Sequence, residues 1–121
     1  MKKYGFPKQN RLISKNDFAL VFLEKNIIND TFLRCYYKKN PYNYTRMGIV
    51  IGRKFGKAHT RNRFKRLVRE SFRLYPDNTF GMDIVILPNL RNKSVEYDAI
   101  CESMSRLLVR SYKKLGYTNP C

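Results

Sequence analysis

The sequence has few of the residues that small proteins use for covalent cross-links or metal sites. Among 121 residues it contains one His, three Cys and no Trp. The cysteines Cys35, Cys101 and Cys121 are odd in number and far apart, which favours reduced thiols over a disulfide framework. With one His and no Cys-x-x-Cys pair, the sequence predicts no metal site on the protein.

Long hydrophobic runs are also absent. The longest apolar run, residues 18–23, is too short to span a hydrocarbon layer of about 30 Å. The first residues are basic, but no apolar stretch of the kind found in signal peptides follows them. The sequence therefore predicts a cytoplasmic protein with no membrane partner.

Acidic residues are scarce relative to basic ones. Nine Asp and Glu stand against 25 Lys and Arg, which gives a formal net charge of +16. A net charge of about 2 to 8 already keeps a small domain soluble, so this excess predicts a polyanionic partner. The hydrophobic fraction of 43% is sufficient for a core. We therefore expect one domain over residues 1–121 that binds a polyanion, with residues 1–12 loose.

Local patterns predict an alternation of helices and strands. Ser14 is a candidate N-cap for the first helix, which ends near residue 25, and Ser94 is a candidate cap for the last. A short additional strand is possible near Ile27 and Ile28. This order predicts an α/β (α+β) fold, a small α-β sandwich. The main predicted elements are helix 14–25, strand 31–37, strand 47–51, helix 58–75, strand 83–87 and helix 94–115.

The predicted helix 58–75 separates apolar from cationic residues. Residues 46–73 hold ten Lys and Arg and one acid, Glu70. Cations on one helical face lie about 5 to 6 Å apart, which suits contact with successive phosphates of RNA or DNA. Solvated faces usually mix both signs, so the pattern favours nucleic-acid contact over simple solubility. Arg63 lies to one side of this face, where it either pairs with Glu70 or extends the cationic surface.

Phe18 and Phe22 lie one turn apart on the first predicted helix. Such a pair either belongs to the core or stacks on unpaired bases, at about 1 to 3 kcal/mol per base. Both interpretations stay open from the residues alone. The aspartates are scattered and show none of the convergence that a metal-dependent nuclease needs, so we predict no catalytic residue on the protein.

Residues 53–73, which contain Arg61-Asn62-Arg63, resemble the signature of the protein subunit of bacterial ribonuclease P. The pairs Arg11-Leu12, Asp17-Phe18 and Val21-Phe22, and residues 83–86, also fall where that family has them. The resemblance covers roughly residues 10–115. It implies three helices on a mixed sheet of about four strands, with a left-handed β-α-β crossover.

The resemblance also implies that the protein and an RNA have separate roles. In that family a catalytic RNA, with Mg²⁺ as its cofactor, removes the 5′ leader of precursor tRNA. The protein is an accessory subunit that binds both RNAs and lowers the Mg²⁺ requirement. Its expected partners are the catalytic RNA and precursor tRNA, with no obligate protein partner. The alternative is a structural RNA-binding protein such as a ribosomal protein, whose charge and size would be similar.

Site residues follow from the family's motif. The family's leader cleft also uses an aromatic residue of the strand 31–37, a position that Cys35, Tyr36 or Tyr37 could take, and we assign it to Tyr37. The positions that match the catalytic-RNA contacts are Arg61, Asn62, Arg63, Lys65, Arg66 and Arg69. Those assigned to the single-stranded leader are Phe18, Phe22, Tyr37, Arg53 and Lys54.

Overall fold

A mixed sheet of four strands lies at the centre of the computed structural model, which describes residues 10–12, 14–75 and 80–117. The strand order is β1-β2-β4-β3. The pairs β1–β2 and β2–β4 are antiparallel, whereas β3 and β4 are parallel. The strands are β1 (Ile27–Asn29), β2 (Leu33–Lys39), β3 (Arg46–Ile49) and β4 (Met82–Pro88).

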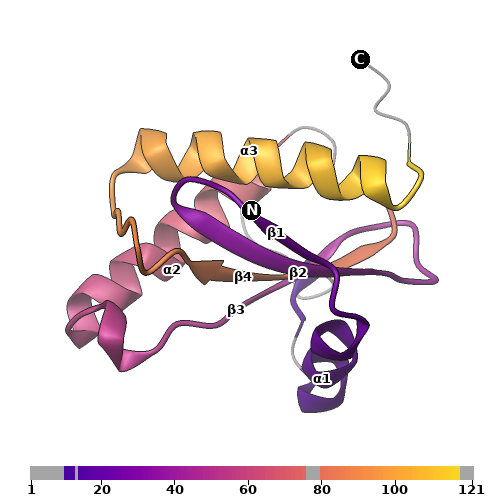
Figure 1. The fold of residues 1–121 in the computed structure, drawn as a ribbon, viewed down its shortest axis with the longest axis horizontal. Coiled ribbons are helices and arrows are strands. Elements are labelled where there is room, and N and C mark those ends of the chain that lie inside the picture. Colours follow the sequence, from indigo (N-terminus) through magenta and orange to yellow (C-terminus); the bar gives the residue numbers. More distant parts are fainter. Residues whose placement is uncertain (1–9, 13, 76–79, 118–121) are drawn as a thin grey trace, which may run out of the picture.

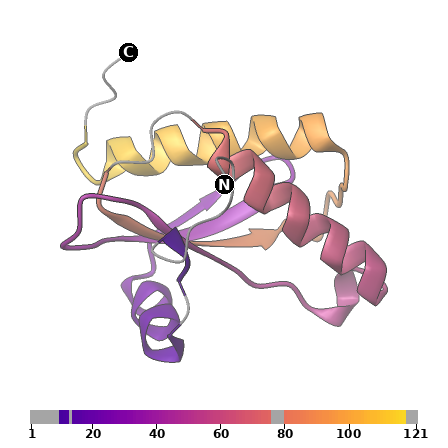
Figure 2. The same cartoon turned by 180° about the vertical axis from the view of Figure 1, so that it is seen from behind.

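Helices cover both faces of the sheet. Two long helices lie on one face and a short helix lies on the other (Figures 1 and 2). The connection from β3 through α2 to the adjacent parallel strand β4 is left-handed, against the general preference. This confirms the fold that the resemblance implied. The helices are α1 (Lys15–Glu24), η2 (Arg53–Phe55), α2 (Ala58–Arg73) and α3 (Tyr97–Lys114).

Local capping explains the limits of α1. The side-chain oxygen of Ser14 accepts hydrogen bonds from the backbone N–H groups of Asn16 and Asp17, at 3.1 and 3.4 Å. It satisfies donors that have no partner within the helix. At the other end Lys25 adopts a left-handed conformation with φ 59° and donates its N–H to the Phe22 carbonyl. The predicted cap and the predicted end of this helix are both confirmed.

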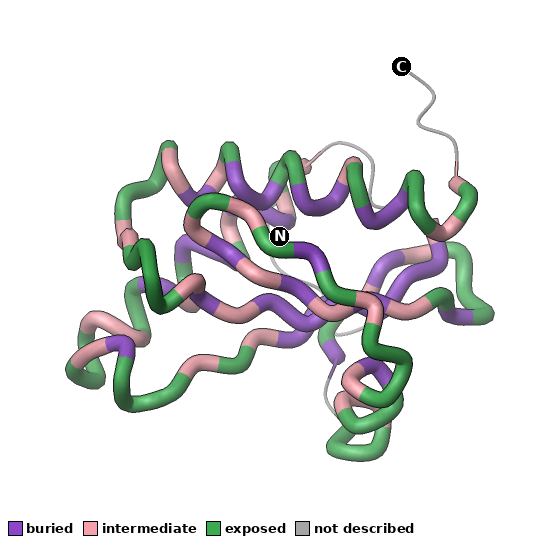
Figure 3. Tube along the Cα trace, in the orientation of Figure 1, coloured by how far each residue is buried: buried purple, intermediate pink, exposed green. Residues whose placement is uncertain are grey.

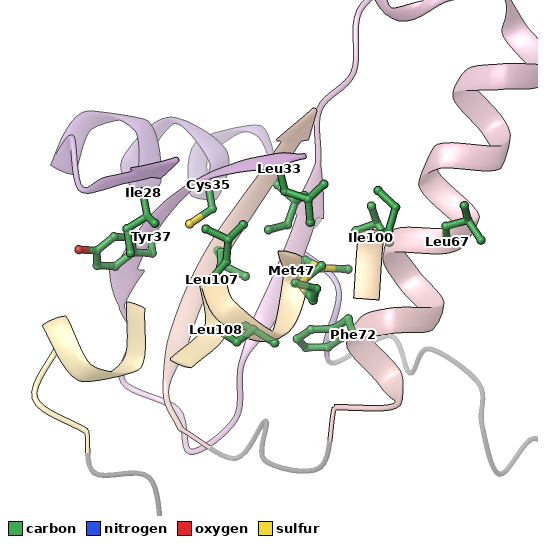
Figure 4. Close-up of a cluster of buried hydrophobic side chains, with 14 of the residues drawn as sticks. Ile28, Leu33, Cys35, Tyr37, Met47, Leu67, Phe72, Ile100, Leu107 and Leu108 are labelled. Atoms are coloured by element: carbon green, nitrogen blue, oxygen red, sulfur yellow. The ribbon is translucent and has the colours of Figure 1, made fainter. Parts of the chain in front are cut away.

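The main core lies between the sheet and the two long helices. Alternate residues of β2, namely Leu33, Cys35 and Tyr37, point toward α2 and α3 (Figure 4). The central strand β4 is buried on both faces because α1 covers its other side. From the helices the core receives Phe64, Leu67, Val68, Phe72, Ile100, Met104, Leu107, Leu108 and Tyr112.

A smaller apolar cluster joins α1 to the opposite face of the sheet. Its buried members are Leu12, Val21 and Val85. Much of the remaining surface of α1 is exposed (Figure 3). The helix is therefore held to the sheet along a narrow contact. The half-buried members of this cluster are Phe18, Phe22, Tyr36 and Leu87.

Residues 10–12 are ordered by the sheet, which corrects the prediction that residues 1–12 are loose. Leu12 is 4% exposed, and its N–H donates to the Met47 carbonyl at 3.0 Å. The side-chain amide of Asn10 donates to the Thr45 carbonyl at 2.8 Å. These contacts with and beside β3 could not be seen in the local sequence. The rest of the predicted loose segment, residues 1–9, lies outside the described residues.

Arg46 connects α1 to the sheet electrostatically. Its Nε and Nη2 atoms donate to the Asp83 carboxylate at 2.8 and 2.7 Å, and its Nη1 atom donates to Asp17 of α1 at 3.3 Å. The hydrogen bonds to Asp83 are the largest cause that raises the pKa of Arg46. The side-chain amide of Asn40 also donates to Asp83, at 2.8 Å. This network fixes α1, and with it the aromatic residues of α1, against the sheet.

Candidate nucleic-acid interface

The helix α2 presents the cationic surface that the sequence predicted. Its inner side is formed by Phe64, Leu67, Val68, Ser71 and Phe72, all buried. The opposite side is open to solvent or half-buried. We call the residues of that side the α2 cationic face: Arg61, Asn62, Lys65, Arg66 and Arg69.

The acids of the described chain leave this face positively charged. Among the residues that the structure describes, the only ion pair that involves α2 joins Arg73 and Glu70, at 3.9 Å. Arg63 is exposed, and its Nε atom donates to the Val95 carbonyl at 3.2 Å. Arg63 therefore does not pair with Glu70, which was one of the two roles predicted for it. The Nε atom of Arg61 is buried without a hydrogen-bond partner within the described ranges.

A second surface forms where α1 lies on the sheet. Tyr36 of β2, Val85 of β4 and Gly48 of β3 lie side by side in register on the face below α1. The rings of Phe22 and Tyr36 meet edge to face, with their centroids 4.7 Å apart. The ring of Phe18 lies against Gly48, because a Cβ atom placed at Gly48 would be 2.3 Å from the Phe18 Cζ atom. Each ring of the aromatic pair of α1 thus packs on the sheet and stays half-buried, so the core interpretation accounts for only part of its surface.

The assignment of Tyr37 to the leader-binding surface is wrong. Tyr37 is 4% exposed and belongs to the main core, as does the fully buried Cys35. Successive side chains of a strand point to opposite faces, so the residue between them, Tyr36, faces α1. Burial raises the pKa of Cys35 to about 12, so this thiol stays protonated and acts as an apolar core residue.

A pocket of about 500 Å³ joins the α1 surface to the α2 cationic face. Phe18 and Gly48 form one side of it, and Lys65 and Arg69 of α2 form another. Arg11 also lines this pocket. The aromatic and cationic residues, which the sequence placed in separate elements, therefore meet at one site.

The same face of the sheet continues beyond α1. We call the surface on this face the cleft; it reaches from the pocket at Phe18 of α1 to the pockets beside Leu90, which follows β4. A pocket of about 620 Å³ is lined by Arg34, Leu90 and Arg91, among others. A neighbouring pocket of about 240 Å³ includes Arg53 and Lys54. These two residues, which the sequence assigned to the leader, therefore lie at the edge of the cleft.

Sequence reasoning missed several cleft residues. Arg34 precedes Tyr36 by two positions and so shares its face, a signal that strand alternation alone contains. Leu90 and Arg91 follow β4 in a loop, where no periodic pattern exists to place them.

The described residues contain no group that could act as a protein metal centre. Within residues 10–12, 14–75 and 80–117, no three His, Cys, Asp or Glu side chains come together in a way that could hold a metal ion. The carboxylates of Asp17, Asp30 and Asp83 are each paired with arginine. In the same ranges, no helix combines the length and the apolar composition needed to cross a bilayer.

Comparisons with known proteins agree with this arrangement. The family model for ribonuclease P matches residues 6–112. The ribonuclease P protein component of Thermotoga petrophila is 37% identical over 114 residues, which cover 88% of this chain and 95% of the relative. That of Legionella pneumophila is 43% identical over 95 residues, which cover 75% and 81%. These matches favour ribonuclease P over the ribosomal-protein alternative.

Solved structures show the same fold. The ribonuclease P protein of Thermotoga maritima superposes with a TM-score of 0.73 at 37% identity, over 83% of this chain and 96% of that one. The Staphylococcus aureus ribonuclease P protein superposes with a TM-score of 0.75 over 84% and 94% of the two chains. At 23% identity the second comparison supports the fold alone.

The contact between Gly48 and Phe18 can be tested by adding one methyl group. In Gly48→Ala the new Cβ atom would meet the Phe18 ring at 2.3 Å, so the ring or the strand must shift. We expect a loss of about 1 to 3 kcal/mol in the free energy of unfolding, as for other overpacked sites, measured by urea denaturation.

Gly52→Ala is the matched control, because no atom lies within 4 Å of a Cβ placed there. Its unfolding free energy should change by about 0.5 kcal/mol or less. Equal stability of the two variants would contradict the close packing of Phe18 on β3.

Proposed function

The chain belongs to the ribonuclease P protein family, and from this premise we propose that it binds two RNAs at adjoining surfaces. The family's proteins are subunits of ribonuclease P, the endoribonuclease that processes the 5′ end of tRNA. We assign the catalytic RNA to the α2 cationic face and the single-stranded leader of precursor tRNA to the cleft. The observation that carries the proposal is the pocket in which Phe18 lies beside Lys65 and Arg69.

The α2 cationic face suits a folded RNA. Its side chains extend from one rigid helix whose other side is fixed in the core, so their spacing is set before binding. Guanidinium groups bind phosphates through paired hydrogen bonds. The unpartnered Nε atom of Arg61 is a donor that such a phosphate would satisfy.

The cleft suits a single strand. Half-buried Phe18, Phe22 and Tyr36 offer aromatic surface on which unpaired bases can stack, whatever their sequence. Arg53 and Lys54 at the cleft edge supply charge for the backbone of the same strand. Stacking and charge together are typical of single-strand binding without strict sequence preference.

The chemistry of cleavage then belongs to the catalytic RNA. The paired and scattered carboxylates of the described chain do not form a two-metal site, so we assign the Mg²⁺ ions to the RNA. The protein's contribution is electrostatic: its cations offset the repulsion between two RNAs and so lower the Mg²⁺ concentration needed for assembly. We place this activity in the cytoplasm, and it requires no further protein.

Reconstitution tests the proposal directly. Adding the protein to the cognate catalytic RNA at low Mg²⁺ should restore removal of the leader, because the cations replace part of the screening that Mg²⁺ provides. The measurement is the rate of leader release under single-turnover conditions. No stimulation at any Mg²⁺ concentration would refute the proposed role, and cleavage by the protein without RNA would favour a protein nuclease instead.

The aromatic contribution can be separated from packing. In Phe18→Leu with Phe22→Leu the apolar contact with the small cluster is retained but the flat rings are lost. Each lost stack costs about 1 to 3 kcal/mol of binding, so the holoenzyme should bind precursor tRNA more weakly and mature tRNA equally well. Leu23→Ala, at a residue 73% exposed on α1, is the control and should leave both affinities unchanged. An equal loss of affinity for precursor and mature tRNA would mean that the two rings have a purely structural role.

The phosphate contact of α2 has a signature in salt dependence. Removal of one phosphate contact should decrease the log–log salt slope of binding by about 0.7 to 0.9, the values per phosphate for single strands and for B-DNA. We therefore expect Arg66→Gln to bind the catalytic RNA more weakly, with a slope smaller by this amount. The measurement is binding to the catalytic RNA across a salt series. Lys38→Gln removes one charge from β2 and should keep the slope, and an unchanged slope in both variants would argue against a phosphate at Arg66.

A further inference from the structure

We propose that a leader longer than the cleft continues around the free edge of β1 onto a second basic surface on α3. This inference rests on the proposed binding of the leader in the cleft. We call the second surface the α3 edge. It consists of Arg106, Arg110, Lys113 and Lys114.

The α3 edge is a one-sided cationic face. Its residues fall within an arc of about 100° on the helix, and no acid occurs between Arg106 and Lys114. The arginine side chains at 106 and 110 are 46% and 49% exposed. The one aromatic residue in this stretch, Tyr112, is 2% exposed and lies in the core. The surface therefore offers contacts to phosphates and none to bases.

One carboxylate orients two of these cations. Asp30, whose side chain is 7% exposed, accepts hydrogen bonds from Arg106 Nε at 3.0 Å and Nη2 at 2.7 Å. It also lies 3.7 Å from Arg110 Nη1 and accepts a hydrogen bond from the Ser103 hydroxyl at 2.5 Å. Burial would raise the pKa of Asp30, but the hydrogen bonds from Arg106 and Ser103 outweigh it and lower the pKa.

The result is an arginine pair that is held in place on a surface that stays positively charged. Asp30 faces both guanidinium groups, and Glu102, one turn earlier on α3, also acts on Arg106, but the four cations of the α3 edge outnumber these two acids. The Nη1 atom of Arg106 donates to none of the described residues. A donor group whose orientation is fixed before binding loses less conformational entropy when a phosphate arrives. This geometry favours RNA binding over a purely structural role for both arginines.

The α3 edge is continuous with the cleft. The Nη1 atom of Arg110 donates to the Asn29 carbonyl at 3.3 Å, at the free edge of β1. Asn29 lies opposite Arg34 in the register of β1 and β2, and both line the same pocket of the cleft. The Nε atom of Arg34 is buried without a partner in the described part of the chain. Donors thus extend from the cleft floor, around the strand edge, to α3.

The direction of the RNA follows from the positions of the two basic surfaces. The pocket at Phe18 adjoins Lys65 and Arg69, on the side where we place the catalytic RNA. The 3′ end of the leader, which is the end that is cut, therefore lies at that side. Its 5′ portion leaves the cleft past Arg34, toward the α3 edge.

Leader length tests the inference in the reconstituted holoenzyme. Two precursor tRNAs are compared, with leaders of about four and about sixteen nucleotides, the limits of site size for a single-strand-binding domain. In Arg106→Gln with Arg110→Gln, binding of the long-leader precursor should weaken by about 2- to 5-fold for each cation removed. The salt slope for this precursor should fall by about 1.4, because each single-strand contact contributes about 0.7. The short-leader precursor should bind as before.

One further variant keeps the result interpretable. Arg110→Gln alone leaves the hydrogen bonds between Arg106 and Asp30 intact, so it retains the fold if the double variant does not, and it should show half the slope change. The short-leader precursor is the matched control for both variants. Equal binding of the long leader by the wild type and by Arg110→Gln would overturn the inference, as would an equal loss for the long and the short leader.

The two proposals fail in different ways. If Phe18→Leu with Phe22→Leu weakens both precursors while the α3 variants weaken neither, only the α3 edge is refuted. If the aromatic variant weakens neither precursor, the cleft itself is not the leader site, and both proposals fail.

Discussion

The separation of α2 into an apolar side and a cationic side is the constraint on which the rest of the structure depends. Its inner residues form part of the main core between the sheet and α3, so the helix cannot rotate without exposing them. The outer cations are therefore fixed side by side despite their mutual repulsion, which nearby acids of the described chain do not offset, apart from the Arg73–Glu70 pair. A fold of this kind stores unfavourable charge at one surface, and binding of a polyanion stabilises it by mass action.

The second constraint is the narrow attachment of α1. The helix contacts the sheet through one fully buried residue, Val21, and through half-buried aromatic rings. The ion pairs of Arg46 with Asp17 and Asp83 supplement this limited apolar contact. Because so little of α1 is buried, its aromatic rings are left available beside the sheet. A larger interface would have made α1 more secure and would also have closed the cleft.

Strand alternation shows where sequence reasoning succeeded and where it stopped. It established that Tyr36 and Tyr37 face opposite sides of the sheet but not which of them faces α1. The neighbouring residues of β2 distinguish the two faces. Leu33, Cys35 and Tyr37 form an apolar set, while Arg34 and Lys38 lie on the other side. The assignment of the leader-binding aromatic residue to Tyr37 did not take this difference between the two faces into account.

Other features depended on contacts that are distant in sequence. The cap at Ser14 and the buried side of α2 are local properties, and the sequence predicted both. The order of residues 10–12 arises from hydrogen bonds to Met47 and Thr45, which no local pattern encodes. The left-handed crossover opposes the general rule, so only the resemblance to a known family predicted it.

The placement of the acids explains how one small chain keeps two basic surfaces without losing its shape. Asp83 and Asp17 hold Arg46 at the contact between α1 and the sheet, and Asp30 holds Arg106 where the turn after β1 meets α3. Each of these three acids lies where two elements are joined. The α2 cationic face itself contains no acid, and a carboxylate there would compete with the phosphates that we propose it binds. The scarcity of acids in the sequence and the positions of these three in the fold are therefore related: their negative charge joins elements, and at the α2 cationic face we propose that RNA supplies it.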